Sequence, residues 1–196
     1  MNFLAHIYLS GNDPEILVGN FIGDFVKGRN LAERFDHTVV RGINLHRAID
    51  EYTDRHPVVT ESKTRLREKY RHYAPVIVDV FYDHFLAKIW TQYHDMPLIR
   101  FADVTYHTIQ QYDTILPESV RHMLPYMIRG NWLVHYAEVE GIQRALTGMS
   151  RRTKFNSRMD ESVNDLIRDY DHYEEEFTRF FPDLISHTQK ILLSQH

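Results

Sequence analysis

The sequence predicts an all-α fold, a single-domain helical bundle that spans residues 1–196. Apolar residues recur at helical spacing along most of the chain, and few stretches alternate in the manner of a strand. Prolines at positions 14, 57, 75 and 117 stand near the starts of helical segments, where proline is best tolerated. There is no low-complexity segment, long Gly/Ser linker or internal repeat. A chain of 196 residues suits one domain that buries roughly 70% of its unfolded surface.

The helices follow in order from these signals. Asp13-Pro14 predicts the start of the first helix, which the glycines at 19, 23 and 28 then interrupt. Further helices are expected over about 36–54, from 57, from about 75 past Trp90, and over 98–112, 117–129, 131–147 and 160–181. The apolar stripe of the 160–181 helix is expected to be Val163, Leu166, Ile167, Tyr170, Phe177 and Phe181. Pro182 should separate this helix from a short final one.

Composition and charge exclude several classes of protein. With 23 basic and 27 acidic residues the net charge is −4, which gives no support for nucleic-acid binding. No apolar run approaches the length of a membrane span, so we expect no contact with a membrane. The apolar start of the chain has no basic region before it and contains His6, which argues against a signal peptide. The absence of cysteine excludes disulfides, thiolate zinc sites and a cysteine nucleophile, and it fits a cytoplasmic protein.

The segment 74–90 is apolar on nearly every side, which predicts a helix in the middle of the protein. It nevertheless carries Asp79 and Asp83, four residues apart, with His84 directly after them. A buried carboxylate must be paired, protonated or bound to a metal. These carboxylates could cap a helix or hold an arginine, but two aspartates and a histidine on one buried helix favour a functional site.

Two ionisable residues stand alone in apolar surroundings near the start of the chain. His6 lies in FLAHIYL, where a hydrogen-bonded core histidine is the simpler interpretation and a metal ligand is the alternative. Asp24 lies in ILVGNFIGDFV and is more suggestive, because Gly23 and Gly28 allow a close backbone approach or an unusual turn. Both residues are therefore candidates for a site.

The stretch GINLHRAIDEYTD, residues 42–54, places His46, Asp50 and Asp54 four residues apart on one helical face. This line is rotated by roughly 140° from the apolar stripe of the same helix, which taken alone predicts exposure to solvent. Val39 and Ile43 lie on the line as well, however, and such a mixed face suits the wall of a pocket better.

Histidines and aspartates from three segments thus offer nitrogen and oxygen ligands without sulfur. Such a set suits Mn²⁺, Mg²⁺, Fe or Zn²⁺, and a metal of this kind can activate water and polarise a phosphoryl oxygen. Competing chemistries lack their motifs, because there is no Walker A loop, no GxGxxG after a strand and no GxSxG elbow.

At these same residues the sequence resembles the acyl carrier protein phosphodiesterase family. The resemblance runs through MNFLAH, GNFIGDFVKG, the GIxLHRxID…TD pattern at 42–54 and DVFYDHFLA at 79–87. It continues through NWL at 131–133 and the aromatic-rich C-terminal helix, and it covers essentially the whole chain. The resemblance implies an all-helical, Mn²⁺-dependent enzyme, distantly related to the HD-type metal phosphohydrolases. Where that group has a His-Asp dyad, this chain has the reverse, Asp83-His84.

The activity implied by the resemblance is hydrolysis of the phosphodiester that joins 4′-phosphopantetheine to a serine of holo-acyl carrier protein. The expected mechanism is attack of metal-activated water on phosphorus. The candidate metal ligands are His6, Asp24, His46, Asp83 and His84. Asp50, Asp54 and Asp79 would orient these ligands or act as general base. Arg47, with Lys27, is a candidate phosphate contact, although an exposed pair with Glu51 is the simpler interpretation of this arginine.

The resemblance also implies an acidic protein partner, the acyl carrier protein. Two basic clusters are candidate docking sites: Lys63, Arg65, Arg67, Lys69 and Arg71, and then Arg151, Arg152, Lys154 and Arg158. Such clusters are as often only solvated surface. Two other functions are alternatives, namely a metal phosphohydrolase for a nucleotide or other small phosphoester, and a non-enzymatic helical interaction module. Nothing in the sequence indicates an oligomeric state.

Overall fold

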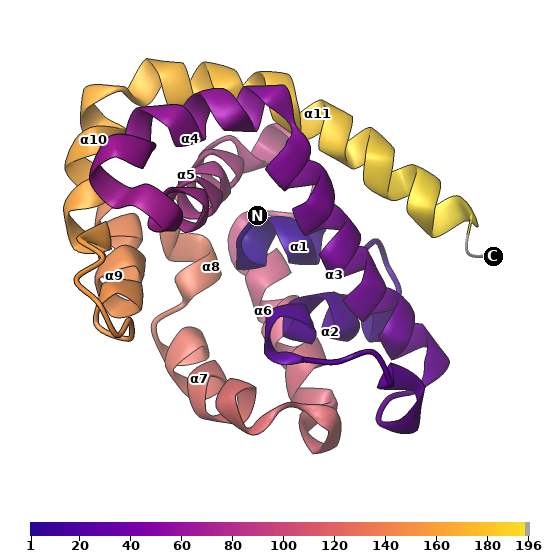
Figure 1. Ribbon diagram of the computed structural model, residues 1–196. Coiled ribbons are helices and arrows are strands. Elements are labelled where there is room, and N and C mark those ends of the chain that lie inside the picture. Colours follow the sequence, from indigo (N-terminus) through magenta and orange to yellow (C-terminus); the bar gives the residue numbers. More distant parts are fainter. Residues whose placement is uncertain (195–196) are drawn as a thin grey trace.

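The computed structural model describes residues 1–194, which fold into helices and contain no strand (Figure 1). The all-α fold class is therefore confirmed. The α-helices are α1 (Phe3–Tyr8), α2 (Pro14–Ile22), α3 (His37–Arg55), α4 (Pro57–Tyr70), α5 (Ala74–Lys88), α6 (Leu98–Gln111), α7 (Glu118–Arg129), α8 (Trp132–His135), α9 (Val139–Ser150), α10 (Ser162–Arg168) and α11 (Tyr170–Ser194). Short 3₁₀ turns join several of them, namely η1 (Gly23–Phe25), η2 (Leu31–Glu33), η3 (Arg71–Tyr73), η4 (Trp90–Gln92), η5 (Asp113–Ile115) and η6 (Met159–Glu161).

The helix starts predicted at Pro14, at Pro57 and near Pro75 are confirmed, and the start of α2 shows why. The Asp13 side chain accepts hydrogen bonds from the backbone N–H groups of Glu15 and Ile16, and Pro14 occupies the first helical position. These contacts satisfy groups that a helix leaves unpaired at its N-terminus. Proline likewise opens α4 and lies in the first turn of α5.

The helix predicted as the first is α2, since α1 precedes it, and three further predicted boundaries are wrong. The helix expected to continue past Trp90 ends at Lys88, and the 3₁₀ turn η4 follows it. The helix expected over 131–147 is two helices, α8 and α9, with a turn between them. The segment 160–181 is divided among η6, α10 and the start of α11. Ile167 of the expected apolar stripe is 58% exposed, because α10 ends at Arg168 and the stripe does not continue across the break.

The proline expected to end the C-terminal helix does not end it, since α11 continues through Pro182 to Ser194. Proline removes one backbone hydrogen bond from a helix interior. Buried Phe180, Phe181 and Leu184 lie on both sides of the proline, so packing against the core holds the helix together across it.

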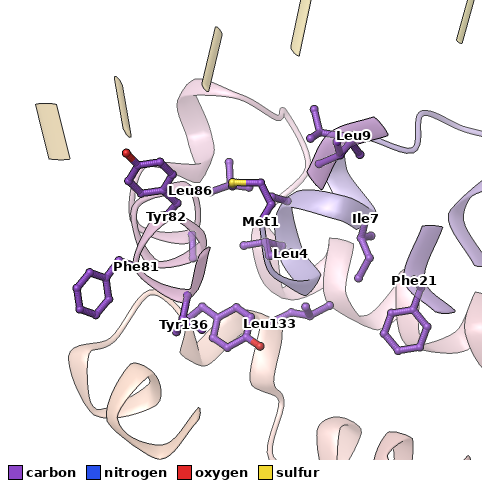
Figure 2. Close-up of a cluster of buried hydrophobic side chains, with 14 of the residues drawn as sticks. Met1, Leu4, Ile7, Leu9, Phe21, Phe81, Tyr82, Leu86, Leu133 and Tyr136 are labelled. Atoms are coloured by element: carbon purple, nitrogen blue, oxygen red, sulfur yellow. The ribbon is translucent and has the colours of Figure 1, made fainter. Parts of the chain in front are cut away.

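The central position predicted for the apolar helix is confirmed. α5 packs against α1, α4, α9 and α11, and most of its side chains are buried. In Figure 1, α4 and α11 run side by side over α5. Figure 2 shows part of the core, to which α1 contributes Leu4 and Ile7 and α5 contributes Phe81 and Leu86.

α2 and α3 cross at close range because two glycines meet at the crossing. A Cβ atom on Gly19 would lie 2.1 Å from the carbonyl oxygen of Val39 and 2.9 Å from Cα of Gly42. A Cβ atom on Gly42 would lie 2.3 Å from the carbonyl oxygen of Ile16. Any larger side chain would force the helices apart, so this contact sets the position of α3 relative to η1.

Within the described residues, no helix combines the length and the apolar character that crossing a membrane requires.

Candidate metal centre and active-site cavity

A histidine from α1 and a histidine and an aspartate from α3 meet at one point. Nε2 of His6 lies 3.1 Å from Oδ1 of Asp50, and Nε2 of His46 lies 3.1 Å from Oδ2 of the same carboxylate. One potential ligand atom from each of these residues lies within 4.8 Å of the others. Asp24 adds a fourth group, because its Oδ1 atom lies 3.2 Å from Nε2 of His46.

The His46 ring fits into this position because residue 23 has no side chain. A Cβ atom on Gly23 would lie only 2.2 Å from Cγ of His46. The glycine lets the ring lie against the backbone of η1, which brings Asp24 within reach of Nε2. The expected close backbone approach at Gly23 is therefore confirmed.

Asn20 of α2 sets the orientation of both imidazole rings. Its amide Nδ2 donates to the carbonyl oxygen of His6 at 2.7 Å and to Oγ of Ser10 at 2.9 Å, so its Oδ1 atom is an acceptor. Nδ1 of His6 donates to this Oδ1 atom at 2.9 Å, and Nδ1 of His46 donates to the backbone carbonyl of Asn20 at 2.8 Å. With the protons on Nδ1, both Nε2 atoms face the carboxylate of Asp50.

The electrostatics of this cluster match a cation site. Burial, with the neighbouring His46, lowers the pKa of His6 to about 4, so its ring is neutral at pH 7. Burial opposes charge on His46 as well, but hydrogen bonds to Asp24 and Asp50 raise the pKa of this residue to about 9. Burial disfavours the Asp50 carboxylate, yet the two histidines outweigh it and hold the pKa of Asp50 below its usual range.

Neutral His6 leaves its Nε2 lone pair facing two acceptors, the Asp50 carboxylate and the carbonyl oxygen of Met1, which lies at 3.1 Å. The two rings also stack, with centroids 3.9 Å apart, which disfavours a charge on both. A divalent cation that displaces the Nε2 proton of His46 would satisfy both Nε2 atoms and the carboxylate at once. The residues present therefore fit a metal ion with nitrogen and oxygen ligands.

The cluster lies at the wall of a large cavity, of about 680 Å³. This volume lies within the roughly 300–1,000 Å³ that small-molecule sites occupy. One wall carries Asp24, Asp50, Thr53, Asp54 and Asp79. The facing wall comes from α7, α8, α9 and the turn after α9. Its lining residues include Met123, Trp132, His135, Gly141, Arg144, Ala145, Gly148, Met149 and Arg152. The second wall is not predicted from the sequence, where its local signal is the three- and four-residue spacing along α9.

Comparisons with known proteins identify the family. The family model described as "Acyl carrier protein phosphodiesterase" matches residues 1–184 of the chain. The chain belongs to this family. Two proteins named acyl carrier protein phosphodiesterase, from Escherichia coli O6:H1 and O45:K1, are each 38% identical to the chain over 194 residues. The alignments cover 97% of this chain and 98% of each relative. No solved structure matches the chain at a significant level.

The structure of this family member does not bring two of the predicted ligands, Asp83 and His84, into the cluster. The Asp83 carboxylate accepts hydrogen bonds from the backbone N–H groups of Leu4 and Ala5, at 2.7 and 3.2 Å. Asp83 is thus a cap for α1, one of the two alternatives expected for a structural carboxylate. Burial raises the pKa of Asp83 to about 7 despite these hydrogen bonds.

His84 points away from the cluster on another side of α5. Its Nδ1 atom bonds to the carbonyl oxygen of Tyr136 and its Nε2 atom bonds to the hydroxyl of Tyr170, both at 2.8 Å. Burial lowers the pKa of His84. Both ring nitrogens are satisfied by the protein, so neither Asp83 nor His84 is kept as a metal ligand.

Asp79 and Asp54 both line the cavity but lie beside the cluster rather than in it. The α-amino group of Met1 lies 3.0 Å from Oδ1 of Asp79 and 3.7 Å from Oδ1 of Asp50. Burial raises the pKa of Asp79. Asp54 is exposed and accepts an ion pair from Lys63 at 3.3 Å.

Arg47 does not line the cavity. Its guanidinium group donates to the carbonyl oxygens of Val26 and Gly28, at 3.4 and 3.0 Å, and so holds the loop that follows η1. The expected pair with Glu51 is wrong as well, because Glu51 pairs with Arg55 at 2.8 Å. The arginines that do line the cavity are Arg144 and Arg152.

Proposed function

We propose that this protein hydrolyses the phosphodiester between 4′-phosphopantetheine and the serine of holo-acyl carrier protein, with release of apo-carrier protein. The family assignment supports this reaction. The observation that carries it is the pair of histidine Nε2 atoms directed at Asp50, beside a cavity large enough for a phosphopantetheine group. We further propose that residues 1–196 act as one helical domain in the cytoplasm.

Mn²⁺ is the proposed cofactor, with Mg²⁺, Fe or Zn²⁺ as alternatives of the same ligand chemistry. His6, His46 and Asp50 would hold it, with Asp24 as the exposed fourth ligand. A divalent cation bound there would lower the pKa of water and withdraw charge from the phosphoryl group.

The protein's own residues have distinct parts in this reaction. Asn20 holds both histidine rings with their Nε2 atoms toward the cation. Asp79 faces the cavity with a raised pKa, which suits a carboxylate that takes a proton from the attacking water. Asp54 pairs with Lys63 at the exposed end of the same wall, and its proposed role is to orient the metal ligands. Arg152 replaces Arg47 as the proposed phosphate contact.

The carrier protein is proposed to dock on the basic cluster at 151–158 rather than on the cluster at 63–71. In the earlier cluster, Lys63 pairs with Asp54, Arg65 with Glu176, and Lys69 with Glu161 and Asp165. Carboxylates of the same chain thus neutralise most of its charge.

The later cluster keeps more of its charge free. Arg151 and Lys154 form no ion pair with any residue between 1 and 194, and Arg152 bonds only to the carbonyl oxygen of Gly148. Phe155 is 74% exposed between these cations. A basic surface with one exposed aromatic side chain at the rim of the cavity fits an acidic protein whose modified serine must reach that cavity.

Mass spectrometry of holo-acyl carrier protein incubated with this protein and Mn²⁺ tests the reaction. We expect the mass of 4′-phosphopantetheine to be lost from the carrier, and the loss to stop with EDTA or in His46→Ala. His107→Ala, which removes an exposed histidine of α6, is the matched control and should retain full turnover. An unchanged carrier mass with the wild-type protein and Mn²⁺ would refute the proposed reaction.

Charge reversal tests the docking surface. Arg151→Glu with Lys154→Glu should raise KM about tenfold, leave kcat unchanged and flatten the dependence of KM on salt. Arg67→Glu with Arg71→Glu makes the same change of charge in the other cluster and should leave KM at the wild-type value. Equal effects of the two double variants would rule out the surface at 151–158.

A further inference from the structure

The carboxylates and the arginines of the cavity lie on different walls. Its carboxylates, those of Asp24, Asp50, Asp54 and Asp79, all come from the wall built by η1, α3 and α5. The facing wall contains thioether, indole and guanidinium groups, together with a stretch of α9 that has almost no side chain. Nothing in the proposed hydrolytic chemistry requires this second wall to be apolar or open.

The open stretch of α9 lies between Arg144 of this helix and Arg152 of the turn that follows it. Positions 141, 144, 145, 148, 149 and 152 line the cavity and follow the three- and four-residue spacing of one helical face. Ala145 and Gly148 occupy the middle of this face, while Arg144 and Arg152 border it. Arg144 makes no hydrogen bond or ion pair with the described part of the chain, so its guanidinium group is available to a ligand.

The two glycines of this face have different reasons to lack a side chain. A Cβ atom on Gly141 would lie 1.8 Å from the carbonyl oxygen of His135, so the turn before α9 requires glycine there. A Cβ atom on Gly148 would meet no atom within 4 Å. Glycine is a poor helix former, and packing gives no reason for it at position 148. What Gly148 provides is space within the cavity.

A buried polar atom in the opposite wall also points to a ligand. Thr53 of α3 is 2% exposed, and its Oγ1 atom has no hydrogen-bond partner among residues 1–194. It lies on the wall between Asp50 and Asp54. Buried hydroxyl groups are normally paired, because an unpaired one loses its hydrogen bonds to water without compensation. A ligand with an amide or hydroxyl group would supply the missing partner.

We propose that the α9 wall is the subsite for the pantetheine arm of the substrate, and that Gly148 provides the width through which the arm passes. This inference rests on the proposed function, since it names where the rest of that substrate lies. The arm is an uncharged chain with two methyl groups, a hydroxyl, two amides and a thiol. Met123, Trp132 and Met149 suit its apolar parts, and Thr53 and Arg144 suit its polar ones. With the phosphate at the carboxylate wall, the cavity leads the arm toward α9.

Binding of free 4′-phosphopantetheine to the Mn²⁺-loaded protein tests the subsite. Trp132 lines the cavity and Trp90 is buried in the core, so tryptophan fluorescence should change on binding in the wild type and not in Trp132→Phe. Gly148→Leu should raise Kd at least tenfold and raise KM for holo-carrier protein, with Gly148→Ala between it and the wild type. Inorganic phosphate, which lacks the arm, should bind Gly148→Leu as well as it binds the wild type.

The matched control is Glu140→Leu, which adds the same side chain to α9 at an exposed position outside the cavity. It should leave both Kd and KM unchanged. Wild-type Kd and KM in a folded Gly148→Leu variant that still releases phosphopantetheine would overturn the subsite and leave the proposed reaction intact. Conversely, a Gly148-dependent Kd in a protein that hydrolyses no carrier would support the subsite and refute the reaction.

Discussion

Two regions of this protein hold a buried histidine close to an aspartate, and they satisfy these side chains in opposite ways. On α5, Asp83 accepts two backbone N–H groups and His84 bonds through both ring nitrogens, so each group has a protein partner. In the cluster of His6, His46 and Asp50, the Nε2 atoms of two rings face one carboxylate. Burial of ionisable groups alone therefore does not identify a site. The cluster differs from α5 because it holds more hydrogen-bond acceptors than donors, and a cation would satisfy these acceptors.

The largest effect expected is the loss of turnover in Asp50→Ala. The carboxylate contacts both histidines, so its removal should lower kcat for holo-carrier protein by about 10³-fold or more, equivalent to several kcal/mol of transition-state stabilisation. Steady-state release of 4′-phosphopantetheine measures this. Turnover in Asp50→Ala within tenfold of the wild type, at saturating Mn²⁺, would remove Asp50 from the site.

The corresponding substitution on α5 should affect stability instead. Asp83→Ala leaves the buried N–H groups of Leu4 and Ala5 without an acceptor, which should cost about 2–4 kcal/mol of the free energy of unfolding. Asp83→Asn keeps one acceptor oxygen and should cost less. Urea denaturation gives both values, and the folded fraction of each variant should keep the wild-type kcat. A selective loss of kcat in Asp83→Asn would instead return Asp83 to the catalytic machinery.

Removing the group that orients a histidine ring should have different effects on Mn²⁺ affinity in the metal cluster and on α5. Asn20→Leu deletes the acceptor for Nδ1 of His6 and should weaken Mn²⁺ binding about 10–100-fold. Tyr170→Phe deletes the hydroxyl that bonds Nε2 of His84 and should cost only about 1 kcal/mol of stability, with Mn²⁺ affinity unchanged. Isothermal titration of each variant with Mn²⁺ measures the affinities. Equal Mn²⁺ affinity in the two variants would contradict the assigned role of Asn20.

The smallest expected effects are those of pH. His46 has a pKa of about 9 in the metal-free protein and His6 a pKa of about 4, so Mn²⁺ must displace one proton near neutral pH, from His46. The apparent affinity for Mn²⁺ should rise about tenfold per pH unit between pH 6.5 and 8. His84→Ala should show the same slope. Titration calorimetry in two buffers of different ionisation enthalpy counts the protons, and release of none would contradict the protonation of His46.

The same pKa predicts how the metal-free protein responds to pH. The folded-state pKa of His46 lies above the 6.5 of an unperturbed histidine, so the stabilisation from its protonated form is fully present below pH 6.5. It is lost as the pH rises from 6.5 through 9. The melting temperature of the metal-free protein should fall across this window, by about 2–4 °C for each kcal/mol lost.

Helical periodicity and proline positions predicted most of the fold, and the errors have local physical causes. The starts of α2, α4 and α5 followed from their prolines, because proline acts within a single turn. The turn between α8 and α9 and the continuation of α11 through Pro182 depend on tertiary packing. Local signals do not contain that information.

The site could be predicted only in part, for a similar reason. His6, Asp24, His46 and Asp50 were all identified as polar groups in apolar or mixed surroundings, and the fold brings them together. The same criterion also selected Asp83, whose partners are backbone groups of a helix that lies far away in the sequence. Asn20 and Thr53 gave no signal, because the role of each depends on what lies beside it in three dimensions.

Electron paramagnetic resonance of Mn²⁺ tests the central claim most directly, by counting the ions that the wild type, His46→Ala and His84→Ala bind. We expect one tightly bound Mn²⁺ in the wild type and in folded His84→Ala, and none in His46→Ala at the same free concentration. Loss of the bound ion from His84→Ala, with binding retained in His46→Ala, would place the metal on α5 and contradict the site described above.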